Sequence, residues 1–134
     1  MPVIDASVYV SLTNESDRHH GRCVSWLGET LETDESLVAP SLLLVEVTAS
    51  IRRLTGDGKL AARVGDELQA LELVELVPLT LERSKSAAMI AAKTAVRGAD
   101  AVYLALAKER RETLVTLDRQ QLERGGEVAT VQRP

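Results

Sequence analysis

Residues 97–118 read RGADAVYLALAKERRETLVTLD, and they contain both kinds of element from which this chain is built. The apolar pattern that follows Gly98 predicts a helix over Ala99–Arg111. Leu114–Leu117 is a short apolar run between polar residues, which is typical of a buried strand. The stretch therefore predicts a helix that leads into a strand, and an acidic residue, Asp118, follows that strand directly.

The same alternation of short apolar strands and helices runs through the rest of the chain. The other predicted helices cover approximately Ala6–Leu12, His19–Leu31, Ser41–Leu54, Lys59–Leu71 and Leu81–Ala95, and the other predicted strands are Val3–Ile4, Leu37–Ala39 (stopped by Pro40), Leu73–Leu79 and an edge strand at Val128–Val131. This order indicates an α/β fold, a three-layer α/β/α sandwich around a small, mainly parallel sheet. Ligands of such sheets bind beyond the carboxyl ends of the strands, so functional residues are expected there.

Length and composition are those of one globular domain. The chain has 134 residues, of which 45% are hydrophobic and 27% charged, and we expect residues 1–134 to form a single domain. The lone cysteine, Cys23, excludes an internal disulfide. The opening MPVID places a charge where a signal peptide has its apolar core, and no apolar run is long enough to span a membrane. A cytoplasmic protein is therefore expected.

Charge and aromatic content limit how the chain could bind nucleic acid. The formal net charge is −4, which argues against a protein that coats nucleic acid through electrostatics alone. Tyr9, Trp26 and Tyr103 are the only aromatic residues, too few for a base-stacking platform. A nuclease with an acidic, metal-recruiting site remains compatible with this composition.

Four acidic residues stand out by their positions. Asp5 follows the first strand and Asp118 the fourth, Asp100 lies in the first turn of a helix, and Glu46 lies on an apolar helix face. Each position also has a purely structural interpretation. Asp5 and Asp118 can cap helices, Asp100 suits a helix dipole, and Glu46 can pair with a buried arginine. All four can nevertheless converge on one edge of a small parallel sheet.

A convergence of carboxylates has a clear chemical use. Oxygen ligands suit hard cations such as Mg²⁺ or Mn²⁺ rather than zinc. Crowded carboxylates repel one another, and a bound divalent ion relieves that repulsion. Such an ion can activate water and stabilise the leaving group in phosphodiester hydrolysis.

Four stretches of the sequence resemble the motifs of the PIN-domain ribonucleases, and in particular the VapC-type toxins of toxin–antitoxin systems. They are Val3-Ile4-Asp5-Ala6-Ser7, Val45-Glu46-Val47 within its helix, Arg97-Gly98-Ala99-Asp100 with the helix that follows, and Leu114-Val115-Thr116-Leu117-Asp118. Length, order and spacing match over essentially the whole chain, so the resemblance implies a PIN-like fold.

The resemblance also implies a function. It implies a magnesium-dependent endoribonuclease, with Mn²⁺ as a substitute ion, that leaves 5′-phosphate and 3′-hydroxyl ends. The implied metal ligands, direct or through water, are Asp5, Glu46, Asp100 and Asp118, and the implied orienting hydroxyls are those of Ser7 and Thr116. Compact size favours the toxin of a type II pair, with an RNA substrate, a cognate antitoxin and a homodimer as partners. A PIN nuclease in RNA processing and a catalytically silent, partner-binding PIN scaffold are the alternatives.

Basic residues and histidines give weaker signals. Arg97 adjoins the acidic positions and is a candidate RNA contact, although an exposed basic residue is the simpler interpretation. The same choice applies to a basic cluster formed by Arg52, Arg53, Lys59 and Arg63. His19 and His20 are adjacent and diverge by about 100° in a helix, so a solvated helix start is favoured over a metal site. Cys23 is expected in the core.

Two other enzyme and signalling classes fit less well. A haloacid-dehalogenase-like phosphatase needs a second acid two residues after the first, and Ser7 occupies that position. A receiver-like signalling module needs paired N-terminal acids and a lysine after a late strand, and the chain shows neither.

Overall fold

A computed structural model describes all residues of the chain, 1–134. Its centre is a five-stranded, all-parallel sheet in the order β3-β2-β1-β4-β5. The strands are β1 (Val3–Ile4), β2 (Leu37–Pro40), β3 (Val74–Val77), β4 (Leu114–Val115) and β5 (Val131–Gln132). The order reverses direction at β1, which lies between β2 and β4, so the chain has a switch point beside Asp5.

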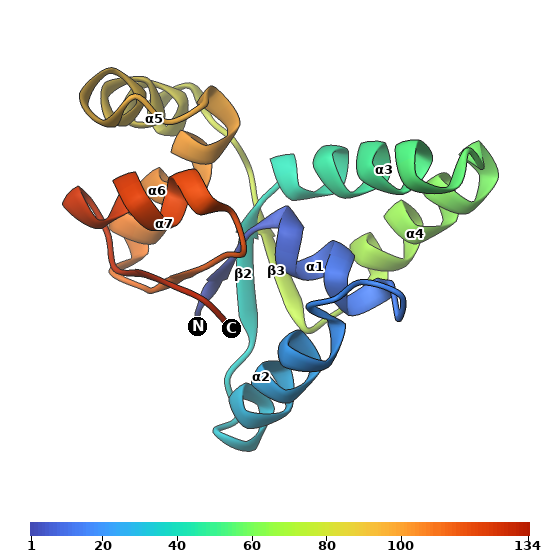
Figure 1. Cartoon of the computed structure of the whole chain (residues 1–134). Coiled ribbons are helices and arrows are strands. Elements are labelled where there is room, and N and C mark those ends of the chain that lie inside the picture. The colour runs from blue at the N-terminus through green and yellow to red at the C-terminus, as the bar shows by residue number, and fades with distance from the viewer.

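Helices cover both faces of this sheet. They are α1 (Ala6–Thr13), α2 (His20–Glu32), α3 (Leu42–Thr55), α4 (Gly58–Ala70), α5 (Leu81–Thr94), α6 (Gly98–Arg110) and α7 (Arg119–Arg124), with a 3₁₀ turn, η1, at Gly125–Glu127. Figure 1 shows α5 and α6 on one side of the strands and α1 to α4 on the other. The predicted α/β/α sandwich is therefore confirmed. None of the helices is long and apolar enough to cross a membrane.

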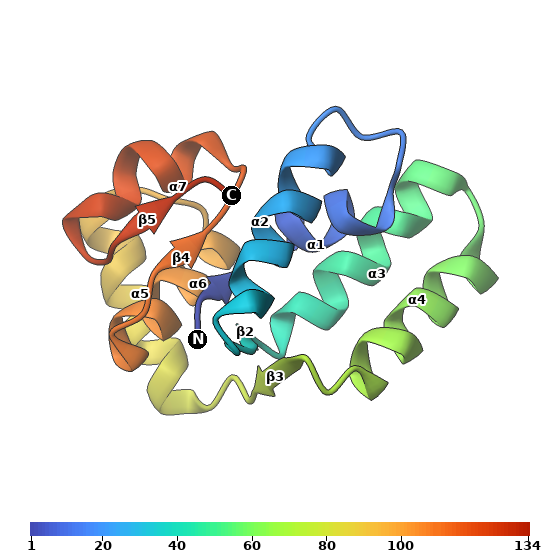
Figure 2. The ribbon, with the colours of Figure 1, turned by 90° about the horizontal axis from the view of Figure 1, so that it is seen from below.

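Helices α3 and α4 form a hairpin that extends away from the sheet, as Figure 2 shows from below. Helix α3 ends at Thr55, one residue beyond the predicted Leu54, and Gly56 caps it with a φ of 69°, which is left-handed and favours glycine. Leu43 and Val47 lie one turn apart on α3 and are both fully buried against the core. Each such side chain contributes roughly 1.5–3 kcal/mol of transfer free energy. Glu46, on the adjoining face of α3, lines the cleft at the strand ends.

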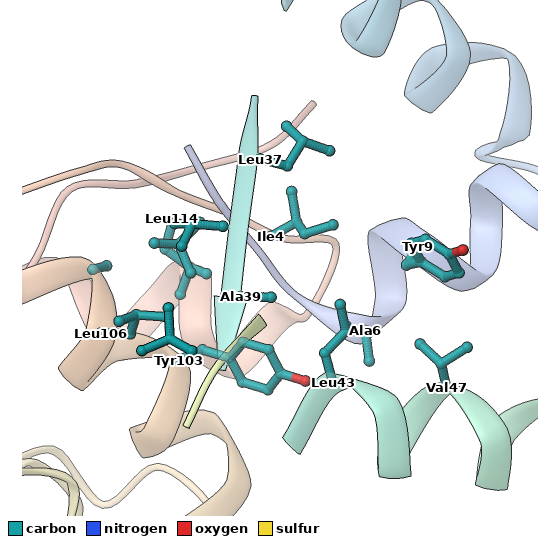
Figure 3. Packing of buried hydrophobic residues seen from close by; sticks show 14 of the residues in the cluster. Ile4, Ala6, Tyr9, Leu37, Ala39, Leu43, Val47, Tyr103, Leu106 and Leu114 are labelled. Carbon is teal, nitrogen blue, oxygen red and sulfur yellow. The ribbon is translucent and has the colours of Figure 1, made fainter. Parts of the chain in front are cut away.

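The core lies between the sheet and its helices. Figure 3 shows Ile4, Leu37 and Leu114 from three neighbouring strands with Leu106 and Tyr103 from α6, and all five are almost completely buried. Cys23 is also buried, as predicted, beside Val8 and Val115. Burial raises the pKa of its thiol.

Four predicted strands have different bounds in the structure. The second continues through Pro40, which pairs with Val77 of β3, so the prediction that Pro40 stops this strand was wrong. The third strand ends at Val77, before Pro78, which has no backbone N–H to donate. The fourth ends at Val115, so Asp118 does not follow it directly but caps α7, a helix that the sequence indicated only as a capped turn. The fifth strand starts at Val131 because η1 occupies residues 125–127. These shifts still leave Asp118 at the same end of the sheet.

Candidate active site

A cleft of about 560 Å³ opens at the carboxyl ends of the strands. All four acids singled out in the sequence line it: Asp5 after β1, Glu46 on α3, Asp100 on α6 and Asp118 before α7. Ser7 and Arg97 line it as well. The structure thus brings together residues that are up to 113 positions apart in the chain, which independent helix caps would not require.

Asp5 is held rigidly by hydroxyl groups. Its Oδ2 accepts hydrogen bonds from the Ser7 hydroxyl at 2.6 Å, from the Ser7 backbone N–H at 3.1 Å and from the Thr116 hydroxyl at 3.2 Å. Asp5 is only 5% exposed. All three bonds go to Oδ2, so Oδ1 keeps its lone pairs. Ser7 and Thr116 therefore orient the Asp5 carboxylate, as the sequence motifs imply.

The two hydroxyls also tie β4 to the site. The Ser7 hydroxyl accepts from the Leu117 N–H at 3.1 Å, and the Thr116 hydroxyl accepts from the Asp118 N–H at 2.9 Å. Asp118 in turn accepts from the Gln121 N–H through Oδ1, which caps α7. The structural interpretation of Asp118 as a cap is thus correct, and it leaves Oδ2 directed at the cleft.

Arg97 bridges Asp100 and Asp118. Its Nε donates to Asp100 Oδ2 at 3.0 Å and its Nη2 donates to Asp118 Oδ2 at 2.7 Å. Asp100 is nearly buried, whereas the Arg97 side chain is 65% exposed. Arg97 therefore neutralises part of the negative charge of the site from its solvent side.

Glu46 is half-buried and incompletely bonded. Its Oε1 is buried without a hydrogen-bond partner, and so is the hydroxyl of Tyr103. Tyr103 lies on α6, and Figure 3 shows its hydroxyl pointing toward Leu43 at the start of α3. The two side chains lie close enough to affect each other's pKa, although neither atom has a partner in hydrogen-bond geometry, so a further polar ligand could be accommodated here.

Burial sets the protonation of two of the acids. Desolvation raises the pKa of Glu46, opposed in part by the neighbouring Tyr103 hydroxyl, and the charges of Asp5 and Asp100 raise it further. Desolvation likewise raises the pKa of Asp100, opposed by its bond to Arg97. The pKa of the Tyr103 hydroxyl is also raised, mainly by burial, so it stays protonated. The site thus holds carboxylates whose negative charges are only partly balanced by nearby positive charges and hydrogen-bond donors.

The donor set fits a hard cation. Every candidate ligand is a carboxylate oxygen, and Glu46 Oε1 is a buried acceptor that lacks a donor. As the side chains stand, no three or more His, Cys, Asp or Glu side chains are arranged to hold a metal ion together. Arg97 occupies the space between two of the acids. The arrangement therefore suits an ion with one or two direct carboxylate ligands and water for the rest.

Sequence reasoning missed part of the cleft wall. Asp17 and Arg18, from the α1–α2 connection, line the cleft and were not singled out, and His19 lines it although a solvated helix start was favoured for it. Arg53, from the predicted basic cluster, lines the cleft too, whereas Arg52, Lys59 and Arg63 do not. His20 instead bonds through Nδ1 to the Ser11 carbonyl oxygen at 2.8 Å. The predicted divergence of the two histidines is consistent with this. Nothing in the spacing of residues 14–19 indicates that their loop folds over the strand ends.

Comparison with known proteins identifies the family. The model of the PIN domain family matches residues 3–127, almost the full length. The chain belongs to the PIN-domain family. PIN domains are generally nucleases that use a divalent metal ion. A comparison with curated protein sequences found no match.

Solved PIN-domain structures share this fold at low sequence identity. VapC20 of Mycobacterium tuberculosis, described as a Sarcin-Ricin loop cleaving toxin, is 17% identical with a TM-score of 0.73, over 89% of this chain and 91% of that one. FitAcB from Neisseria gonorrhoeae is 20% identical with a TM-score of 0.72, over 98% and 96%. VapBC2 from Rickettsia felis, bound to a promoter DNA fragment, is 11% identical with a TM-score of 0.70, over 98% and 97%.

Proposed function

We propose that this PIN domain is a metal-dependent endoribonuclease and the toxin of a type II toxin–antitoxin pair. One observation carries the proposal: carboxylates from four separate segments, Asp5, Glu46, Asp100 and Asp118, line one cleft at the strand ends. A cytoplasmic location and a single domain over residues 1–134 belong to the same proposal. The low-identity likeness to VapC20 and the VapBC and FitAB proteins supports it at the level of the fold.

We assign the metal, Mg²⁺ with Mn²⁺ as a substitute, to the oxygens that lack donors. Asp5 and Glu46 supply the free oxygens Oδ1 and Oε1, and Asp100 and Asp118 contribute directly or through water. A bound divalent ion would supply Lewis-acid polarisation of the phosphodiester and lower the pKa of water. The hydroxyls of Ser7 and Thr116 hold Asp5 in a fixed orientation, which reduces the reorganisation needed in the reaction.

We assign Arg97 as the residue that contacts the RNA beside the four acids. Its guanidinium is mostly exposed at the cleft mouth and has two carboxylate partners in the structure. A phosphate that approaches the site offers the same bidentate geometry as a carboxylate. Arg97 thus neutralises the acids in the resting protein and attracts the substrate backbone.

The test is cleavage of RNA by the purified chain. Wild type with Mg²⁺ should cut single-stranded RNA and leave 5′-phosphate ends, and EDTA should stop it. Asp5→Asn and Asp100→Asn should each lose the activity while keeping the circular dichroism spectrum of the wild type. Undiminished cleavage by either folded variant would overturn the assignment.

An antitoxin has a suitable surface beside the cleft. A second hollow of about 300 Å³ lies between α1, α3 and α4, and it is lined by Ile51, Leu54, Leu60 and Val64 together with polar residues. Leu54 lines both this hollow and the cleft. An extended antitoxin segment could place apolar residues in the hollow and a basic side chain among the carboxylates. Coexpression with the neighbouring gene product, followed by an activity assay, tests whether the complex is inactive.

Three finer points remain proposals with simple measurements. A homodimer is expected from the resemblance, and light scattering on the purified chain measures its mass. A silent scaffold would bind no Mg²⁺ and cleave no RNA. A processing nuclease would cleave RNA without harm to the cell, so growth on induction separates it from a toxin.

A further inference from the structure

The cleft that holds the acids also has a basic wall. Arg18 and His19, from the loop between α1 and α2, and Arg53, from the last turn of α3, line the same hollow as the carboxylates. No carboxylate lies within 4.0 Å of either arginine, although Arg83, Arg97, Arg110 and Arg119 all have such partners. Two arginines without a carboxylate partner therefore share one cleft with the four acids, and the Asp17 carboxylate beside them bonds to Ser11 and to the His19 backbone instead.

The bonds that the wall does make are to neutral groups. Arg18 Nε donates to His19 Nε2 at 3.1 Å, and Arg53 Nη2 lies 3.4 Å from the Ser50 hydroxyl. Because His19 Nε2 accepts a bond, its Nδ1 carries the proton and is a donor. Both guanidinium groups keep their full charge and most of their donors for a ligand.

The loop that carries Arg18 and His19 is fixed in place. Asp17 Oδ1 accepts from the His19 backbone N–H at 2.7 Å and from the buried Ser11 hydroxyl at 3.1 Å. His20 is bonded to the Ser11 carbonyl oxygen from the start of α2. Two of these bonds anchor the loop to Ser11 of α1 and the third lies within the loop, so the wall is positioned before any ligand arrives.

We propose that Arg18, His19 and Arg53 form a phosphate-binding wall that holds the RNA backbone next to the phosphate at the acids; this rests on the proposed function. A linear polyanion fits a cleft that holds both the acids and two unpaired arginines, because one phosphate can lie at the acids while a neighbouring phosphate lies at the arginines. The basic cluster that was noted in the sequence does not lie at the cleft as a whole. Arg53 belongs to the wall, whereas Arg52 lies over Gly58 at the start of α4 and does not line the cleft.

Arg52 provides a matched control for Arg53. Arg52 and Arg53 are adjacent, both exposed and both in the last turn of α3. Alanine at either position removes one positive charge from the same end of α3. Any difference in RNA binding between the two variants therefore reflects the position of the side chain and not the net charge. Both substitutions keep good helix formers.

The experiment measures how RNA affinity depends on salt. Variants are made in an Asp5→Asn background, and binding of a 12-nucleotide single-stranded RNA is followed by fluorescence anisotropy in EDTA over a series of KCl concentrations. Each lost phosphate contact should reduce the slope of log Kd against log salt by about 0.7. Arg18→Ala and Arg53→Ala should each show this reduction and Arg52→Ala should not. His19→Ala should weaken binding, because it removes a hydrogen-bond donor that lines the cleft.

Equal slopes of log Kd against log salt for Arg53→Ala and Arg52→Ala would contradict the proposed phosphate-binding wall. So would an unchanged RNA slope in Arg53→Ala together with weakened binding of a polyglutamate peptide, which would assign the wall to a protein partner. Cleavage by wild type against Asp5→Asn is scored separately. Absent cleavage with the expected slopes would defeat the proposed function and leave the wall standing.

Discussion

Arg97 Nη2 lies 2.7 Å from Asp118 Oδ2 at the mouth of the acidic cleft, and the same guanidinium also bonds Asp100 through Nε. The charges of Asp100 and Asp118 would repel each other without it. Arg97 therefore supplies a positive charge between these two carboxylates, and the proposed metal ion would compete with the guanidinium for them.

Replacing Arg97 should separate these two roles. In EDTA, Arg97→Gln should melt a few degrees below wild type, because an exposed ion pair is worth at most about 1 kcal/mol and the acids lose their counterion. Millimolar Mg²⁺ should raise the melting temperature of the variant more than that of wild type, because ligand binding stabilises the folded state and the guanidinium no longer competes. Arg119→Gln, which breaks a surface pair with Glu123 away from the cleft, is the control. Equal magnesium shifts in all three proteins would contradict the competition.

The buried acids should make the metal-free protein more stable in mild acid. The pKa values of Glu46 and Asp100 are raised above 4.5 and 3.8, mainly by desolvation, so the folded state binds protons more tightly than the unfolded chain. Their contribution to stability is therefore complete below those ordinary values and is lost as the pH rises through the raised pKa values. Urea unfolding in EDTA should show a free energy of unfolding that increases as the pH falls from neutrality toward about 5.

Glu46→Gln provides the control for that pH dependence, because glutamine does not titrate. The increase in stability should be smaller in Glu46→Gln than in wild type. Mg²⁺ should reverse the trend in wild type, because the ion binds only ionised carboxylates. An identical pH dependence in the two proteins would show that Glu46 does not contribute.

Ser7 should set the affinity for the metal through Asp5. Ser7→Ala removes the 2.6 Å bond to Asp5 and leaves the Leu117 N–H without its acceptor. Loss of such an orienting bond typically costs 10- to 100-fold in metal affinity. Titration calorimetry with Mn²⁺ measures this directly, with Ser86→Ala on the exposed face of α5 as the control. Unchanged Mn²⁺ affinity in Ser7→Ala would remove Ser7 from the site.

Local sequence signals predicted the acids of the site but not all of its surroundings. Asp5, Glu46, Asp100 and Asp118 could be selected because each interrupts an apolar pattern or ends one, and parallel strands bring such positions to one edge. Arg18 and His19 could not, because a loop has no periodicity and its course depends on bonds from Asp17 to Ser11 that only the folded chain shows.

The bounds of the strands and the surroundings of Tyr103 are further features that local sequence signals did not predict. Apolar runs overestimated β3 and β4 because side-chain hydrophobicity continues after the backbone pairing ends, at Pro78 and Thr116. From the sequence alone, Tyr103 is only one of three aromatic residues. In the structure it lies one turn after Asp100 on α6 and faces Glu46. The sequence predicts that Tyr103 lies in this helix, but only the folded chain brings its hydroxyl near Glu46 of α3.

The hollow between α3 and α4 yields a prediction about antitoxin binding. Leu54 lines both this hollow and the cleft, and Val45 lies on the same helix without lining either. Each is 63% exposed, so neither is needed for the core. Leu54→Gln should weaken antitoxin binding by an amount typical of a truncated apolar interface contact, about 1–2 kcal/mol or roughly 5- to 30-fold in Kd. Val45→Gln should leave the Kd unchanged, because it alters an equally exposed apolar residue of α3 outside both hollows. Calorimetry with an antitoxin made separately measures both constants, and circular dichroism checks that both variants remain folded. If Val45→Gln weakens the complex and Leu54→Gln does not, the antitoxin binds the outer face of α3 and the shared hollow is not its site.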